Sequence, residues 1–216
     1  MSGTLYVVPT PIGNLEDITL RALRILKECD LIACEDTRQS LKLLSYFKLP
    51  KHLISFYSYN GQHRIKGLID KLLNGKKIAL ISDAGTPAIS DPGYSLIKEV
   101  ISKNINLEVL PGSSAVVTAL VGSGLPTAGF IFCGFLKRKS SKIRKELVGL
   151  TNLEKTIIFY ESPYRILKTI EMCLDIFGQD AQICLARGMI KKFEEFIRGT
   201  IKEVLESIEN RKSLLG

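Results

Sequence analysis

The chain has 216 residues, of which 45% are hydrophobic, 24% are charged and 7% are aromatic. This balance is typical of a folded soluble protein and excludes a largely disordered chain. No stretch approaches the roughly 18 consecutive apolar residues of a membrane-spanning helix, and the N-terminal sequence MSGTLYVVPT lacks the pattern of a signal peptide. The composition therefore predicts a cytoplasmic protein that is not associated with a membrane.

The net charge of +8 comes from 30 basic and 22 acidic side chains, which are unevenly distributed. The segment 137–145 carries six positive charges and no negative charge. A solvated helix face explains most charge runs, but six like charges repel one another unless an anion lies near. The segment is therefore a candidate phosphate-binding surface. Its basic residues are Lys137, Arg138, Lys139, Lys142, Arg144 and Lys145.

The cysteines give no sign of a disulfide framework or a metal centre. There are five of them, an odd number, and no two form a CxxC pair. Cys29 and Cys34 are close in sequence, but no nearby His or Cys pair completes a zinc-binding set. The pattern indicates buried free thiols in a reducing compartment and predicts no metal.

In chain order, the first half alternates short β-branched runs with longer segments of helical period. Strands are predicted at 4–8, 31–34, 52–56, 77–81 and 106–110, and helices at 17–29, 39–47, 62–74 and 94–103. Glu16 and Asp17 suit the positive end of the first helix dipole. Strand–helix alternation favours a largely parallel sheet with helices on both faces.

The second half continues the alternation. Helices are predicted at 114–122, 140–150, 164–177 and 201–211, and strands at 128–134, 156–161, 181–187 and 193–198. Glycine and proline interrupt the pattern at 111–114 and 122–126. We therefore predict two α/β lobes, residues 1–113 and 114–216.

Loops that carry glycine and proline, or in one case only polar and charged residues, follow four of the strands predicted in the first lobe. They are 9–14, 35–38, 82–93 and 111–115. Any one of them could be an ordinary strand-to-helix loop. In a parallel sheet, however, ligands bind at the carboxyl ends of the strands, so four such loops predict one binding crevice. No GxGxxG or Walker sequence occurs, which argues against a dinucleotide or a simple phosphate cradle.

These loops also carry a resemblance that extends over essentially the whole chain. The segments LYVVPTPIGNLEDITLRAL at 5–23, EDTR at 35–38, SDAGTP at 82–87, SDPG at 90–93 and ESPYR at 161–165 closely resemble the bacterial ribosomal RNA small subunit methyltransferase I family. That family belongs to the tetrapyrrole-methylase-like class of S-adenosylmethionine enzymes. Its members methylate the 2′-hydroxyl of a cytidine in 16S rRNA of the small ribosomal subunit. The resemblance implies two α/β lobes, with S-adenosylmethionine in the cleft between them, and a homodimer.

By position in the motifs, the resemblance also implies the residues that contact the cofactor. They lie in the loops of the first lobe, at the start of the second, and beside two strands of the second. They are Pro11, Ile12, Asp83, Gly85, Thr86, Ser114, Ala115, Tyr160 and Met189.

A 2′-hydroxyl is a weak nucleophile, so a base or an oriented hydrogen-bond acceptor should assist its attack. The motifs contain four candidate carboxylates, and for each of them a role as a helix cap or loop-closing acceptor is an alternative. Among them, Asp36 and Glu161 are our hypothesis for the pair that faces the substrate. Arg38 and Arg165 are hypothesised to bind RNA phosphates, together with the basic segment 137–145.

The sequence departs from the family pattern where relatives usually carry histidine. Other residues occupy these positions: Gln39, Tyr57, Tyr59, Tyr164 and Phe193. Since the only histidines are His52 and His63, we expect catalysis without an imidazole base. Two alternatives remain open, namely a small-molecule or protein methyltransferase of the same class, and a cofactor- and RNA-binding homologue with impaired catalysis. Relatives continue into another strand after the last predicted helix, so the second lobe is expected to end before that strand.

Overall fold

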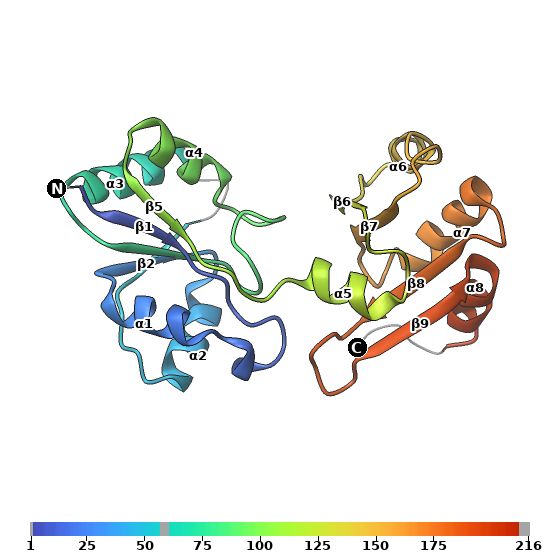
Figure 1. Ribbon diagram of the computed structural model, residues 1–216, viewed down its shortest axis with the longest axis horizontal. Coiled ribbons are helices and arrows are strands. Elements are labelled where there is room, and N and C mark those ends of the chain that lie inside the picture. The colour runs from blue at the N-terminus through green and yellow to red at the C-terminus, as the bar shows by residue number, and fades with distance from the viewer. Residues whose placement is uncertain (1, 57–60, 212–216) are drawn as a thin grey trace. The chain divides into compact units, whose positions relative to one another are not determined.

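The computed structural model describes residues 2–56 and 61–211. The chain divides into two compact units, Met1–Ser114 and Ala115–Gly216. Both units combine helices with strands, and the first is built on a parallel sheet (Figure 1). The predicted α/β class is confirmed. In the described part of the chain, no helix is long and apolar enough to cross a membrane.

The first unit contains a five-stranded sheet in the order β3-β2-β4-β1-β5, and every neighbouring pair is parallel. Its strands are β1 (Thr4–Val7), β2 (Leu31–Cys34), β3 (Leu53–Ser55), β4 (Ile78–Ile81) and β5 (Asn106–Val109). Its α-helices are α1 (Leu20–Glu28), α2 (Thr37–Tyr46), α3 (Gly61–Leu73) and α4 (Tyr94–Ser102), and a short 3₁₀ helix spans Leu15–Asp17. All five predicted strands form at or within one or two residues of their expected bounds.

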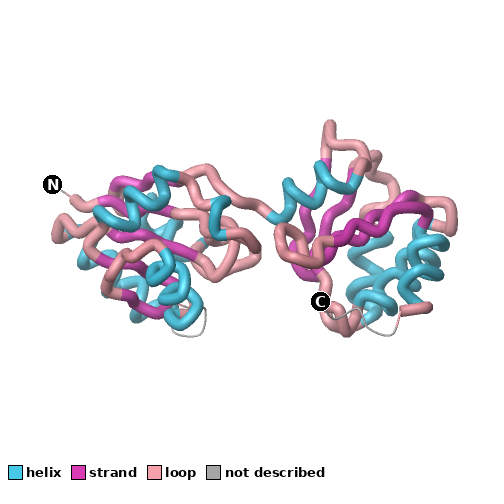
Figure 2. Tube along the Cα trace, turned by 90° about the horizontal axis from the view of Figure 1, so that it is seen from below, coloured by secondary structure: helices cyan, strands magenta, loops and turns pink. Residues whose placement is uncertain are grey.

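Helices cover both faces of this sheet, with α1 and α2 on one face and α3 and α4 on the other (Figures 1 and 2). Successive residues of the central strands alternate between two apolar clusters, because side chains in a strand point to opposite faces. On the α3 and α4 face, the strand residues are Leu5, Leu31, Ala33, Ile78 and Leu80. On the α1 and α2 face, they are Tyr6, Ile32, Cys34, Ala79 and Ile81, together with Val8, which directly follows β1. Burial on both sides explains the nearly continuous apolar sequence of these strands.

The first helix begins later than the sequence pattern predicts. Ile18 and Thr19 have extended backbone dihedrals, and they separate the 3₁₀ turn at Leu15–Asp17 from α1. The Thr19 side chain accepts a hydrogen bond from the main-chain N–H of Ala22 at 3.0 Å, so Thr19 is the N-cap of α1. The expectation that Glu16 and Asp17 open this helix was wrong. The threonine cap determines where the helix begins.

The second unit has two separate two-stranded sheets. Strands β6 (Phe130–Phe135) and β7 (Thr156–Tyr160) are parallel, whereas β8 (Gln182–Arg187) and β9 (Glu195–Thr200) form an antiparallel pair. Its helices are α5 (Ala115–Ser123), α6 (Ser140–Val148), α7 (Ile166–Phe177) and α8 (Ile201–Glu209). A single apolar cluster joins α6, α7 and α8 to strand residues such as Phe159, Leu185 and Ile197.

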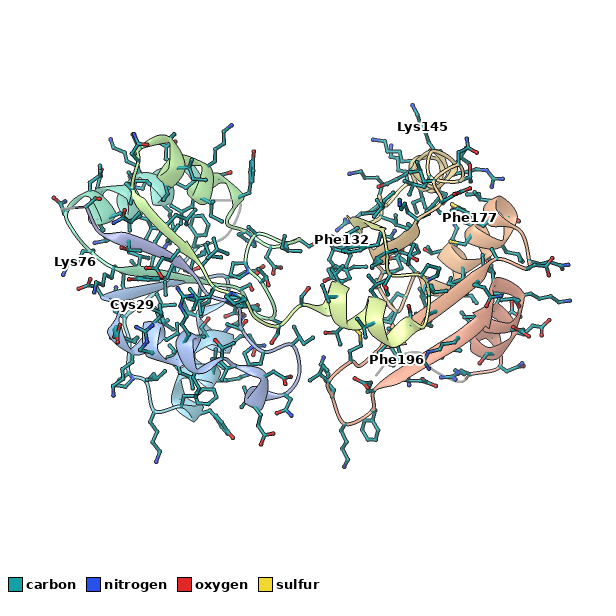
Figure 3. The ribbon with its side chains drawn as sticks, in the orientation of Figure 1. Cys29, Lys76, Phe132, Lys145, Phe177 and Phe196 are labelled. Carbon is teal, nitrogen blue, oxygen red and sulfur yellow. The ribbon has the colours of Figure 1, made fainter. Side chains whose placement is uncertain are left out.

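Helix α5 is attached to the antiparallel pair near its C-terminal end. A Cβ atom added to Gly122 would lie 2.5 Å from the ring of Phe196 in β9, so the close approach requires glycine. The Arg198 guanidinium stacks on the same ring at 4.9 Å and donates from Nε to the Gly122 carbonyl at 3.0 Å. Figure 3 shows the labelled Phe196 beside the end of α5. These contacts connect α5 to the remainder of the second unit.

Candidate active site

In the first unit, the loops after β1 and β4 are joined directly. Thr10 and Gly85 form an isolated bridge in which each main-chain N–H donates to the other's carbonyl at 2.9 Å. The buried Thr10 hydroxyl also donates to the Ser82 carbonyl at 3.0 Å. β1 and β4 are neighbours in the sheet, and the helices that follow them cover opposite faces. The carboxyl ends of these two strands therefore form the topological switch point of the sheet, which is where open α/β sheets bind their ligands.

The loop after β5 packs against the same two loops. The Thr86 hydroxyl donates to the Ser113 carbonyl at 3.2 Å. A Cβ atom added to Gly112 would lie 2.5 Å from Cβ of Pro9, so no larger residue fits there without displacing the first loop. Three of the four loops are thus held at one edge of the sheet by main-chain contacts and hydroxyl groups.

Asp36 brings the fourth loop, after β2, to this edge. Its main-chain N–H donates to Oδ1 of Asp83 at 3.1 Å, across 47 residues of sequence. Its own carboxylate caps α2 by accepting from the Arg38 N–H at 2.8 Å, and it pairs with the Arg38 guanidinium at 2.7 Å. Hydrogen bonds from the Arg38 guanidinium and main chain lower the Asp36 pKa to about 2. Asp36 is therefore ionised throughout the neutral range, which makes it a good hydrogen-bond acceptor and a weak base.

Two further carboxyl groups at this edge have pKa values above their usual range. Partial burial, followed by the negative charges of Asp83, Asp91 and Asp36, raises the pKa of Glu35. Burial and Asp83 raise the pKa of Asp91, which a hydrogen bond with Ser82 partly offsets. Glu35 was not among the candidates chosen from sequence, because its environment depends on Asp83 and Asp91, which are 48 and 56 residues away. The carboxylates create a negative electrostatic potential at this edge, and a bound cation would reduce the repulsion between them.

The residues of the first unit that were predicted to contact a cofactor surround this same edge. Pro11, Ile12 and Thr86 are half-buried, and Gly85 is buried with a φ of 82°. A Cβ atom built on Gly85 would be 3.4 Å from Cγ2 of Ile12 and 3.8 Å from the Ser113 carbonyl oxygen. The geometry brings these candidates together with Asp83 and Ser113, and Ser114 directly follows Ser113 in the chain.

The other predicted contacts lie in the second unit, beside a cavity of about 550 Å³. Residues Thr156–Tyr160 of β7 and 183–187 of β8 line it, together with Met189 and Glu161. The Tyr160 ring contacts Phe132 edge-on, with centroids 5.0 Å apart, and Phe135 at 5.3 Å. Tyr160 and Met189 therefore share the wall of a mostly apolar cavity, an environment suited to a flat aromatic ligand group.

The Glu161 side chain is enclosed, with 3% of it exposed. Its two carboxylate oxygens accept from the Ser162 N–H at 2.7 Å and from the Thr169 hydroxyl at 2.8 Å, and Oε2 lies 3.1 Å from Nη2 of Arg165. Thr169 was missed by sequence reasoning, because it lies on α7, eight residues along the chain. These contacts favour a positioning role for Glu161, because its oxygens are already hydrogen-bonded inside the unit.

Arg165 was hypothesised to bind a phosphate, but its guanidinium is engaged inside the second unit. Besides Glu161, it donates to the main-chain carbonyl of Lys137 at 2.9 Å and to that of Leu136 at 3.5 Å. Arg165 thereby connects the ESPYR turn to the start of the basic segment. Arg38, in contrast, is 86% exposed at its side chain, although it pairs with Asp36.

The basic segment lies in the turn before α6 and on the outer side of that helix. All six of its basic residues are exposed, and Figure 3 shows Lys145 projecting away from the strands. Arg144 pairs with Asp175 at 3.4 Å. Within the described residues, the other five cations form no ion pair.

The two histidines lie outside these arrangements. His52 and His63 are exposed, and the His52 carbonyl accepts from the Ile32 N–H beside β3. Of the positions where the family usually has histidine, Tyr57 and Tyr59 fall outside the described residues. Over residues 2–56 and 61–211, no three His, Cys, Asp or Glu side chains are grouped so that they could hold a metal ion.

Comparisons with known proteins agree on one group. A family model described as tetrapyrrole (corrin/porphyrin) methylases matches residues 4–205. A protein named ribosomal RNA small subunit methyltransferase I from Halalkalibacterium halodurans is 49% identical over 203 residues, covering 94% of this chain and 70% of that protein. The protein of the same name from Thermotoga maritima is 45% identical over 212 residues, and the match covers 98% of this chain and 95% of the Thermotoga protein.

The fold has a counterpart among solved structures. Uroporphyrin-III C-methyltransferase from Thermus thermophilus, complexed with S-adenyl homocysteine, matches with a TM-score of 0.62 at 18% identity. The match covers 95% of this chain and 86% of that one. At this identity, the likeness shows a common fold.

Proposed function

The chain belongs to the ribosomal RNA small subunit methyltransferase I family of tetrapyrrole methylases, and from this membership we propose that it methylates the 2′-hydroxyl of a cytidine in 16S rRNA with S-adenosylmethionine. The observation that carries the proposal is the meeting of the four motif loops at the carboxyl ends of their strands. Relatives at 45% to 49% identity carry the name of an RNA-modifying enzyme, which favours RNA over a tetrapyrrole as substrate.

The residues at this edge fit S-adenosylmethionine in chemistry. The buried Gly85 and the half-buried Pro11 and Ile12 leave main chain and small side chains to hold a nucleoside. The carboxylates of Asp83 and its neighbours suit a positively charged sulfonium, since they repel one another. In the second unit, Tyr160 and Met189 offer an apolar wall for an adenine ring. Ser114 and Ala115 complete the proposed contact set.

When bound, S-adenosylmethionine would supply an electrophilic methyl carbon on a sulfonium. As the 2′-oxygen bonds to that carbon in line, the carbon–sulfur bond would break, S-adenosylhomocysteine would leave and the hydroxyl proton would pass to water. The task of the protein is to hold the reacting groups in alignment and to exclude water. We propose that Asp36, ionised because of Arg38, accepts a hydrogen bond from the 2′-hydroxyl and orients it. Glu161 is proposed to act through Arg165 and Thr169 as a positioning residue, since these groups and Ser162 already engage its oxygens.

The basic segment is proposed to bind the phosphates of the RNA. Its exposed, mostly unpaired cations would release condensed counterions on binding, so affinity should fall as salt rises. Replacing Lys137, Arg138 and Lys139 with Gln should weaken RNA binding and reduce the slope of log K against log salt by about 2 to 3, the usual effect of three phosphate contacts. The matched control replaces three exposed lysines of the first unit: Lys42, Lys66 and Lys98.

We further propose a cytoplasmic homodimer. Val117 and Val121, one turn apart on α5, are 51% and 71% exposed, and an exposed apolar stripe of this kind is suited to covering by a second copy. Light scattering during size-exclusion chromatography, on the wild type and on a Val121→Glu variant, tests this. A monomeric wild type would contradict it.

The function itself is tested with purified protein, labelled S-adenosylmethionine and small ribosomal subunits from a strain that lacks this modification. Mass spectrometry of nuclease fragments should reveal one 2′-O-methylcytidine in 16S rRNA. Cofactor and RNA binding without label transfer would instead support the impaired homologue. Label in a macrocycle or a protein, and none in RNA, would refute the proposal in favour of the other alternative.

A further inference from the structure

The turn that contains the ESPYR sequence holds an aromatic ring out in solvent. Tyr164 is 83% exposed, and among the described residues its ring makes no aromatic or cation–π contact. An exposed aromatic residue on its own needs no explanation. The significance of this ring comes from the rigidity of its backbone and from what lies beside it.

Hydrogen bonds fix the backbone on both sides of the ring. The Tyr164 N–H donates to Oγ of Ser162 at 3.4 Å, and the N–H groups of Arg165 and Ile166 donate to the Ser162 carbonyl at 2.9 Å and 3.1 Å. The Ser162 N–H is held in turn by the enclosed carboxylate of Glu161 at 2.7 Å. The turn therefore presents the ring from a preorganised backbone, which reduces the entropy lost when a ligand packs against it.

The same turn is attached to the most positively charged segment of the chain. Arg165 donates to the Lys137 carbonyl at 2.9 Å, and its guanidinium lies 3.1 Å from the Glu161 carboxylate. This connection fixes the position of Tyr164 relative to the start of the basic segment. An exposed flat ring on a turn that is attached to a segment of unpaired cations is a combination suited to binding single-stranded nucleic acids.

The turn also borders the cavity of the second unit. Glu161 and Pro163, on either side of Ser162, line that cavity, so Tyr164 directly follows a residue of the wall. Tyr164 therefore lies at the border of the cavity whose wall includes the proposed cofactor contacts Tyr160 and Met189.

From this arrangement we propose that Tyr164 is a stacking platform for an unpaired nucleobase of the RNA whose phosphates the basic segment binds. The inference rests on the proposed function. The base must be unpaired, because a paired and stacked base has no free face to offer the ring. The sequence of the base is not selected by this contact, since every base has an aromatic face.

The test measures binding of a single-stranded RNA 15-mer that carries one 2-aminopurine, across a series of salt concentrations. Tyr164→Ala should weaken binding by about 5- to 150-fold, the range for the loss of one stacked base, and leave the salt slope unchanged. Tyr164→Phe keeps the ring and should bind within about twofold of the wild type. The matched control is Tyr46→Ala, which removes a 61% exposed tyrosine from α2 of the first unit.

Fluorescence of the 2-aminopurine supplies a second readout, because stacking quenches its emission. The wild type and Tyr164→Phe should quench it on binding, and Tyr164→Ala should not. If Tyr164→Ala binds and quenches like the wild type while the Lys137, Arg138 and Lys139 triple variant loses affinity, the stacking inference is wrong and the proposed RNA surface stands. If the triple variant also binds normally, the RNA surface is wrong, and the stacking inference is refuted with it.

Discussion

The proposed cofactor site can be tested at one glycine, Gly85, because the structure separates the backbone effect of a substitution from its steric effect. Gly85 has a φ of 82°, in the left-handed region that disfavours residues with a Cβ atom. Any replacement there should reduce the free energy of unfolding by about 1–2 kcal/mol. Gly178, which ends α7, has a similar φ of 85°, and an added Cβ would meet nothing within 4 Å. It is therefore the matched control.

The steric effect differs between the two sites. At Gly85, a Cβ atom would lie 3.4 Å from Ile12 and 3.8 Å from the Ser113 carbonyl, which is ordinary contact. Alanine should therefore fit, whereas the two further methyl groups of valine must displace one of the loops proposed to hold the cofactor. Such overpacking costs about 1–3 kcal/mol, which corresponds to roughly 5- to 150-fold in the dissociation constant.

Isothermal titration calorimetry with S-adenosylmethionine measures that loss, and urea unfolding measures stability. Gly85→Val and Gly178→Val should both remain folded with reduced stability, and only Gly85→Val should lose cofactor affinity. Gly85→Ala should lie between the wild type and Gly85→Val. If Gly85→Val binds within twofold of the wild type, or if Gly178→Val loses as much affinity, the cofactor does not depend on the 82–87 loop as proposed.

Two further predictions concern carboxyl groups. Asp36→Asn should lower the single-turnover rate of methyl transfer by about 10²- to 10⁴-fold with little change in cofactor affinity, whereas Glu161→Gln should act mainly by weakening RNA binding. The controls are His52→Gln and His63→Gln. A tenfold loss of rate in either control, together with loss of an inflection near neutral pH in the rate profile, would show that the hydrogen-bond acceptor has been misassigned. Because the folded-state pKa of Glu35 is raised, its ionisation opposes folding above the usual carboxyl pKa of about 4.3, so Glu35→Gln should increase the free energy of unfolding at pH 7. This gain should vanish near pH 3, where the carboxyl group is protonated in both states, and an equal gain at both pH values in urea unfolding would contradict the assignment.

Local patterns in the sequence were sufficient to predict most helices and strands and the family of the chain. The apolar runs at β1, β2 and β4 predict buried strands, because a strand covered on both faces has no polar side. The motif strings predicted the family, and the 45% to 49% sequence identity to named relatives confirms it. The starts of α1, α7 and β9 were local details that failed, and at α1 a threonine cap took precedence over favourable acidic residues.

Contacts between distant segments were decided by the tertiary structure. The hydrogen bond from the Asp36 N–H to the Asp83 carboxylate forms because β2 and β4 are neighbours in the sheet, although β3 lies between them in the chain. Strand order depends on how whole helices pack across the faces, which the periodicity of a single segment does not record. The raised pKa of Glu35 has the same origin, because the neighbouring charges arrive on other loops.

In the second unit, Arg165 shows how a prediction from sequence can differ from the contacts of the side chain in the folded protein. From the sequence, Arg165 is the last residue of the ESPYR motif, and phosphate binding is a reasonable hypothesis for its guanidinium. In the structure, its guanidinium engages Glu161 and the Lys137 carbonyl, 28 residues away. A carbonyl oxygen contributes nothing distinctive to a sequence, since every residue has one, so only the folded backbone could reveal that Arg165 has this internal partner.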